Sequence, residues 1–192
     1  MSVLSTPARL MVRPFRGYEE LAGAAKGDGQ PRALVGGLRF LFVLGAFVSV
    51  TATGRLAPTE LLSAMLSFAY APVVHAIAVG LAARVVAPQV RLARVFALYA
   101  EGYGPWCFFL MLVAGGALFA PSPARLLGAV GVWMLLGTVL WSMVLTFACF
   151  RSGLGLSRQR AAVATSLHYV ILTALILGYY VAAGQLLPIL RR

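Results

Sequence analysis

The stretch at residues 91–121, RLARVFALYAEGYGPWCFFLMLVAGGALFAP, decides the fold of this chain. It begins with Arg91 and Arg94, continues as an almost uninterrupted apolar run, and ends in a Pro-Ser-Pro turn. A helix needs about 20 apolar residues to cross the hydrocarbon core of a bilayer, and this run is long enough. The stretch therefore predicts a transmembrane helix.

One carboxylate, Glu101, lies inside this run and is followed directly by Gly102-Tyr103-Gly104-Pro105. A carboxylate in the membrane is costly, so we expect Glu101 to face protein or water rather than lipid. Pro105 has no backbone N–H and loosens the helix near the carboxylate. A polar centre of the protein is expected here.

The composition of the whole chain extends this interpretation. Of 192 residues, 61% are hydrophobic and 11% are charged, with a mean hydropathy of +0.90. Soluble domains have about 25% charged residues. The composition predicts an all-α, polytopic membrane helical bundle that forms one unit. Cys107 and Cys149 both lie in apolar segments, and we expect no disulfide between them.

Turn signals divide the apolar part into five transmembrane helices and leave a short N-terminal lead. The lead is residues 1–33, and the membrane domain is residues 34–192, with spans at about 34–50, 61–86, 95–120, 124–150 and 161–187.

The lead contains one helical pattern. Phe15, Tyr18 and Leu21 recur on one face, and Arg16 and Glu19 lie mostly on the other. The pattern indicates either a short amphipathic helix on the membrane surface or a polar helix that packs beside the bundle. The lead has no long apolar run, so we expect no cleaved signal peptide.

The basic residues predict the orientation. The formal net charge is +11, but the basic residues are spread over connecting segments, and we expect no nucleic-acid binding. If the N-terminus is cytoplasmic, twelve of the sixteen basic residues lie on the cytoplasmic side. The positive-inside rule then predicts a cytoplasmic N-terminus and an outside C-terminus. Arginine greatly outnumbers lysine, and alanine and glycine are abundant, which favours a bacterial cytoplasmic membrane.

A depth count brings three ionisable residues together. At about 1.5 Å of rise per residue, His75, Glu101 and His168 each lie roughly 10–14 Å from the cytoplasmic end of their helix. They therefore form one candidate polar layer, with Tyr103 beside it. Three further tyrosines lie near enough to join it: Tyr70, Tyr99 and Tyr169.

This layer has three interpretations. Its members hydrogen-bond across helices and hold the bundle together, or they line a cavity for a substrate, a lipid headgroup or a proton. The third is a zinc site, but no HxxxH or HExxH spacing supports it. We expect no metal and no cofactor.

Other candidates concern packing and lipids. Gly36, Gly37 and the pair Gly178 and Ala182 could let another helix approach closely. Four arginines near the predicted cytoplasmic ends are candidate contacts to lipid headgroups: Arg91, Arg94, Arg158 and Arg160. The sequence has no nucleophile-base-acid pattern, Walker motif or carboxylate pair, and nothing in it demands an enzyme.

The order of these features resembles the Yip family, five-span membrane proteins named for interaction with Ypt/Rab GTPases. The similarity covers about residues 15–187. It includes Pro14 before span one, the stretches Tyr70-Ala71-Pro72 and Tyr99-Ala100-Glu101-Gly102-Tyr103-Gly104-Pro105, a tryptophan (Trp133 or Trp141) in span four, and the loop GLGLSRQRA at 153–161.

The resemblance implies a non-enzymatic membrane protein with a cytoplasmic N-terminus that works through partners or lipids. The Asp-Leu-Tyr-Gly-Pro motif of eukaryotic members is absent. We therefore expect a scaffold or accessory subunit of a membrane complex, associated with lipids and with other membrane proteins or itself. The alternative is a small transporter or lipid-handling protein that uses the His/Glu layer.

Overall fold

The computed structural model describes residues 6–24, 29–119 and 131–190, and these residues contain helices but no strand. The elements are α1 (Thr6–Val12), α2 (Pro14–Ala24), α3 (Gly29–Thr53), α4 (Pro58–Ser67), α5 (Tyr70–Val86), α6 (Leu92–Ala100), the 3-10 helix η1 (Glu101–Tyr103), α7 (Gly104–Phe119), α9 (Val132–Ala148), the π-helical turn η3 (Cys149–Gly153) and α10 (Arg158–Leu190).

Five helical segments are long and apolar enough to cross a membrane. They are Leu34–Thr53, Pro58–Val86, Leu92–Phe119, Val132–Gly153 and Arg158–Gly184. The predicted all-α bundle of five spans is therefore confirmed, and the chain is an integral membrane protein. The predicted beginning of the fourth span, residues 124–130, lies outside the described residues.

Spans two and three are each built from two helices joined at a break, and a proline follows each break. Pro72 is the third residue of α5, and Pro105 is the second residue of α7. Proline is tolerated in the first turn of a helix, where an N–H would have no partner, but not in its interior. The helix therefore restarts just before each proline, and in span three the break is the 3-10 turn Glu101–Tyr103, after which α7 begins at Gly104.

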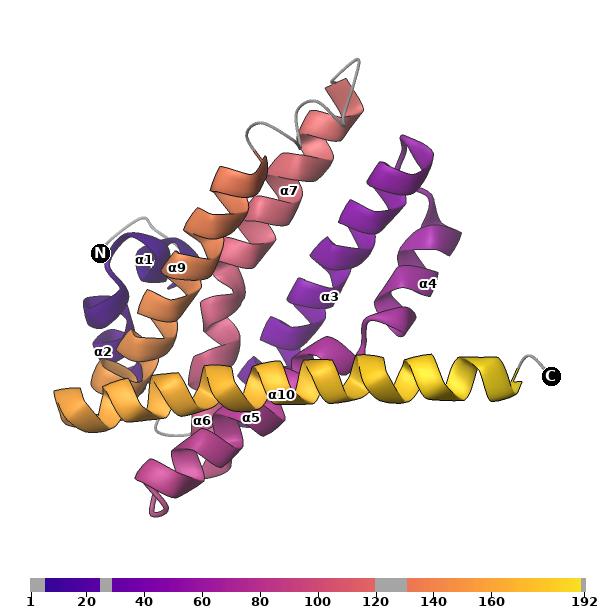
Figure 1. Ribbon diagram of the computed structural model, residues 1–192. Helices are drawn as coiled ribbons and strands as arrows, with labels where there is room; N and C mark the ends of the chain where they lie inside the picture. The colour runs from indigo at the N-terminus through magenta and orange to yellow at the C-terminus, as the bar shows by residue number, and fades with distance from the viewer. Residues whose placement is uncertain (1–5, 25–28, 120–130, 191–192) are drawn as a thin grey trace.

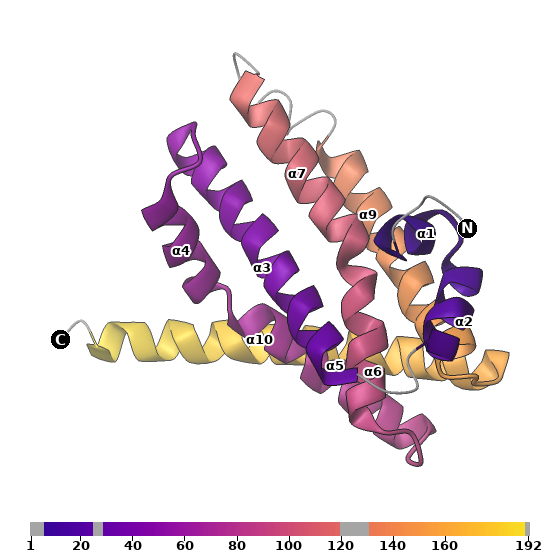
Figure 2. The same ribbon diagram turned by 180° about the vertical axis from the view of Figure 1, so that it is seen from behind.

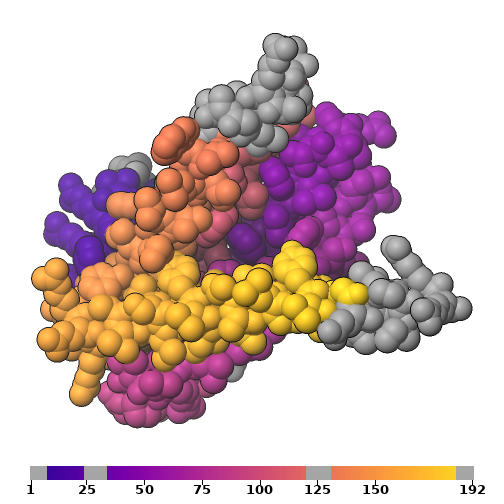
Figure 3. Space-filling view, viewed as in Figure 1, coloured from indigo at the N-terminus to yellow at the C-terminus, as the bar shows by residue number. Residues whose placement is uncertain are grey.

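Four of the helices lie on one side of α10. Figures 1 and 2 show α3, α4, α7 and α9 extending from α10 to the same side, and α3 packs between α4 and α7. Helix α10 lies across the others, and it runs as a continuous exposed band over the face seen in Figure 3. The bundle is closed where α5, α6, η3 and the first half of α10 meet.

Small side chains allow this close packing. Ala82 and Ala83 of α5, Val95 of α6 and Ala161 of α10 are all buried there, around the ring of Phe150. Lipid tails are as apolar as the side chains, so close van der Waals packing between small residues drives much of this association.

The N-terminal helices pack against the bundle. Tyr18 of α2 is 1% exposed and lies in one apolar cluster with Leu10 of α1, Leu98 of α6 and Cys149 of η3. Phe15, predicted on the same helical face as Tyr18, is 41% exposed, and its ring meets the ring of Phe147 edge-on. Because Tyr18 is buried, the pKa of its hydroxyl is raised well above the usual value.

Two glycines of α3 permit backbone contact with neighbouring helices. A Cβ atom at Gly36 would lie 2.9 Å from the carbonyl oxygen of Ala100, and one at Gly45 would lie 2.8 Å from that of Leu61. A Cβ atom at Gly37 would meet nothing closer than Pro72 at 3.8 Å. Gly36 and Gly45 therefore set the distances from α3 to α6 and α4.

We expect Gly36→Ala to lower the free energy of unfolding by about 1–3 kcal/mol, because the added methyl group would overpack a backbone contact. Thermal unfolding in detergent micelles measures the change. Gly37→Ala is the matched control, since it brings the same gain in helix propensity and has room for its methyl group. Equal melting temperatures for the two variants would contradict the prediction.

Candidate functional site

The hydroxyl group of Tyr99 joins three spans. Its oxygen lies 2.8 Å from Nδ1 of His75 and 3.0 Å from Nε2 of His168. Tyr99 belongs to α6, His75 to α5 and His168 to α10. A hydroxyl group has one proton to donate, so one histidine accepts from Tyr99 and the other donates to it. We call this group the His-Tyr-His bridge.

His168 is the most enclosed member of the bridge, with no exposed surface. Its other ring nitrogen, Nδ1, makes no hydrogen bond of normal geometry with a described residue, although the backbone of Ala78 interacts with the same ring. A buried polar atom without a full partner is costly. The bridge to Tyr99 is therefore the main polar interaction that holds this imidazole in the bundle.

A second network joins α7, α9 and α10. The indole Nε1 of Trp106 donates to Oγ of Ser142 at 3.3 Å, and the hydroxyl oxygen of Tyr169 lies 3.4 Å from the same Oγ. The Tyr169 hydroxyl also lies 3.3 Å from Oγ1 of Thr146. Tyr169 follows His168 directly, so α10 contributes to both networks.

Glu101 pairs with an arginine of the first span. Nη2 of Arg39 lies 3.3 Å from Oε2 of Glu101, whose side chain is 13% exposed. The pair joins α3 to η1, the 3-10 turn that precedes Pro105. A charge inside a membrane protein is normally paired in this way. Each of the five spans therefore has at least one polar side-chain bond to another span.

Tyr103 lies between the pair and the bridge. Its ring stacks on Phe40 with centroids 4.8 Å apart and meets the ring of His75 edge-on at 5.8 Å. Its hydroxyl group makes no hydrogen bond to a described residue. Of the four residues of the candidate polar site, His75, Tyr103 and His168 share one cluster, and Glu101 is held to one side by Arg39.

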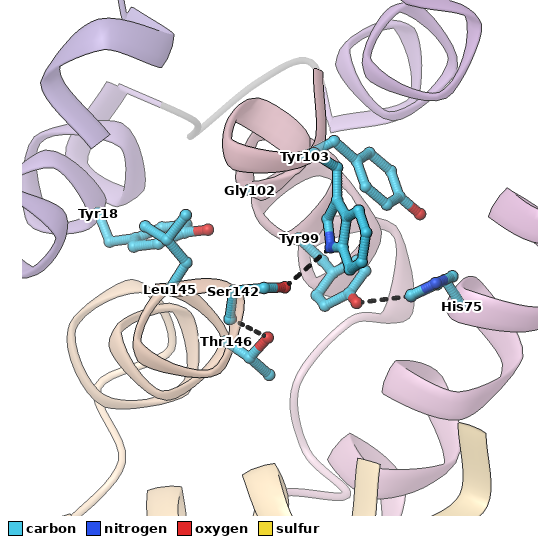
Figure 4. A pocket seen from close by; sticks show the side chains of 9 residues that line it. Tyr18, His75, Tyr99, Gly102, Tyr103, Ser142, Leu145 and Thr146 are labelled. Atoms are coloured by element: carbon cyan, nitrogen blue, oxygen red, sulfur yellow. Dashed lines mark hydrogen bonds between the residues drawn. The ribbon is translucent and has the colours of Figure 1, made fainter. Parts of the chain in front are cut away.

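A small cavity adjoins the bridge, and Figure 4 shows its lining side chains converging from α2, α5, span three and α9. Polar groups of Tyr18, His75, Tyr99, Ser142 and Thr146 surround it. Its volume is about 10 Å³. That is about the space one water molecule needs, and water in such sites normally has two to four polar partners.

The described part of the chain contains no cluster of three or more His, Cys, Asp or Glu side chains that could hold a metal ion. The bridge brings two imidazoles within 6.1 Å of each other, measured between ring centroids, but Glu101 faces Arg39 instead of them. The described residues therefore offer two zinc ligands here and no third.

The four candidate packing residues have different surroundings. Gly36 and Gly37 lie on α3 between its neighbours, and Gly36 touches the backbone of α6. Gly178 and Ala182 lie on the exposed second half of α10, where a Cβ atom at Gly178 would have no neighbour within 4 Å. No described helix covers that face of α10.

The four candidate headgroup arginines are exposed at the ends of spans. Arg91 precedes α6, and Arg94 donates from Nη2 to the carbonyl oxygen of Gly153 at 3.3 Å, which links α6 to η3. Arg158 and Arg160 lie in the first turn of α10.

Several residues of the site were not among the predicted ones. Arg39 was counted only as an orientation signal, although an arginine inside an apolar span is itself a sign of a buried partner. Tyr18 was assigned to an amphipathic face, and nothing in its pattern indicates that it reaches a cavity near Glu101. Ser142 lies in span four between Thr138 and Thr146 at four-residue spacing, a pattern that places the three hydroxyl groups on one helix face and could have identified it.

Comparison with known proteins gives no family for this chain: no family model matches it, no curated protein matches it, and no solved structure matches its fold. The site is therefore interpreted from its own geometry.

We expect Tyr99→Phe to lower the free energy of unfolding by about 1–2 kcal/mol, because it removes both hydrogen bonds of the bridge inside the membrane. Denaturation in detergent micelles measures this value. Tyr103→Phe is the matched control, because Tyr103 is also buried and its hydroxyl has no hydrogen bond to a described residue. The prediction fails if the two variants are equally stable.

For the Arg39–Glu101 pair, we expect Arg39→Gln and Glu101→Gln each to cost about 1–3 kcal/mol of stability, because each leaves a charge without its partner. The double variant should cost clearly less than the sum of the two. A double-mutant cycle on unfolding free energies measures the coupling. Strictly additive costs would show that the two side chains do not interact.

Proposed function

We propose that this chain is a non-enzymatic membrane protein of the Yip type that acts as a scaffold or accessory subunit of a membrane complex. It lies in a bacterial cytoplasmic membrane with its N-terminus inside and its C-terminus outside, as the distribution of arginines indicates. Its partners are lipids and the transmembrane helices of other membrane proteins or of a second copy.

The observation that carries the proposal is the uncovered second half of α10. The first half of α10 packs against α5. Further along α10, the ring of Tyr179 stacks on that of Tyr70, the first residue of α5, with centroids 4.4 Å apart. Gly178 and Ala182, four residues apart, lie on a face that no described helix covers. Two small residues at this spacing let a partner helix approach closely enough for backbone contact in a bilayer.

The polar layer supports the same function. Its main side chains pair with one another inside the bundle, and the cavity beside the bridge has space for about one water molecule. A layer of this kind stabilises a bundle. The alternative function, a small transporter or lipid-handling protein, requires the bridge to open before a solute larger than water can enter.

Native mass spectrometry of the protein, extracted gently from its own membrane, tests the proposal. We expect a second polypeptide or a second copy to be retained, and we expect Gly178→Leu to reduce the complex at least about fivefold, since a bulky side chain prevents close helix approach. The retained polypeptide would also identify the complex.

Gly137→Leu is the matched control, because Gly137 lies on the exposed side of α9 and a Cβ atom there has no neighbour within 4 Å either. It should leave the complex intact. A protein that is always recovered alone, or a complex that tolerates Gly178→Leu, would overturn the proposal. A lone protein that carries a small molecule and loses it with Tyr99→Phe would favour the transporter.

A further inference from the structure

A groove of about 640 Å³ opens where α2, the π-helical turn η3 and the beginning of α10 meet. Figures 1 and 2 both show these three elements together at one end of α10. The volume lies within the range of about 300–1,000 Å³ that is usual for small-ligand sites. The side chains that matter for its chemistry are Phe15, Glu19, Phe147, Arg151, Ser152 and Arg158.

The groove lies at the level of a membrane surface. The fourth span ends at Gly153 and the fifth begins at Arg158, so the loop between them crosses the boundary between hydrocarbon and water. Phe147 lies six residues before Gly153, between one and two helical turns inside that boundary. The amphipathic helix α2 forms the other side of the groove with Phe15 and Glu19. A ligand here would be in contact with lipid on one side and with water on the other.

Two guanidinium groups line the groove. Nη1 of Arg151 donates to the carbonyl oxygen of Leu156 at 2.6 Å, which fixes the side chain and leaves its other N–H groups for a ligand. Arg158 is exposed and has no ion pair with a described residue. Two arginines at one site match the oxygens of a phosphate group.

The apolar wall indicates that the phosphate belongs to a lipid. The rings of Phe15 and Phe147 meet edge-on with centroids 6.1 Å apart, and both line the same groove as the arginines. A free phosphate ion gains nothing from contact with two phenyl rings. An amphipathic molecule with a charged headgroup and an acyl chain can contact the arginines with its headgroup and the two phenyl rings with its chain.

The carboxylate of Glu19 narrows the choice of headgroup. One of its oxygens, Oε1, accepts a hydrogen bond from Oγ of Ser152 at 3.2 Å, which places the carboxylate beside the loop. A carboxylate repels a purely anionic headgroup and attracts an ammonium group, and a primary ammonium can also donate a hydrogen bond to it. The three charges of the groove thus match a headgroup that carries one phosphate and one primary ammonium.

We infer that the groove binds one phospholipid with an ethanolamine headgroup. Arg151 and Arg158 bind the phosphate, Glu19 binds the ammonium group, and an acyl chain lies against Phe15 and Phe147. This site is separate from the proposed partner face at Gly178 and Ala182 on α10. An experiment can therefore disprove either proposal without affecting the other.

The test titrates the purified full chain with phosphatidylethanolamine or phosphatidylglycerol in mixed micelles and counts bound lipids by native mass spectrometry. We expect one ethanolamine lipid to bind, more tightly than the glycerol lipid. Arg158→Gln should weaken this binding about tenfold, the effect of losing one hydrogen-bonded charge pair. Arg160→Gln, which removes the same charge two residues later outside the groove, should not.

Glu19→Gln should abolish the preference for ethanolamine, because the ammonium group loses its partner. Equal weakening by Arg158→Gln and Arg160→Gln would show unspecific attraction to charge and would overturn the site. So would equal binding of both lipids by the unmodified chain. Displacement of the bound lipid by millimolar inorganic phosphate would assign the arginines to free phosphate instead of a lipid.

Discussion

The bond network around Tyr99 is the interaction on which this bundle depends. In a bilayer there is no difference in hydration to drive one apolar helix against another, so packing and polar bonds must hold the spans together. The hydroxyl of Tyr99 joins α5, α6 and α10 in one place. The Arg39–Glu101 pair adds α3, and Ser142 and Tyr169 add α9. Packing of α3 along α6 and α7 and of α10 along α5 completes the connection between the spans.

The five spans were predictable because length and hydropathy report directly on the cost of crossing a membrane. The breaks in spans two and three could also be predicted from the sequence, since Pro72 and Pro105 lack the backbone N–H that a continuous helix requires. The π-helical turn at residues 149–153 was not, because nothing in CFRSG marks an extra residue in a turn. Nor was the contact of Gly45 with α4, which depends on how two helices are rotated toward each other.

The site, too, could be predicted from the sequence only in part. Counting residues gives the depth of a side chain in the membrane but not the direction in which it points. His75 and His168 share a depth and lie together, whereas Glu101, at a similar depth, turns toward Arg39. Tyr99 precedes Glu101 by two residues and so projects from another side of the helix, toward the histidines. The sequence predicts which residues belong to the layer, but which of them interact with each other depends on how the helices pack.

The buried position of Tyr18 has a consequence for how the protein is made. Its neighbours Leu98, Cys149 and Gly153 belong to the third span and to the end of the fourth. Helices α1 and α2 are synthesised before the spans, yet the surface that receives them exists only after the third and fourth spans have been made. Helices α1 and α2 thus reach their final place only after the fourth span is made, and until then Leu10 and Tyr18 lack their contacts with Leu98 and Cys149.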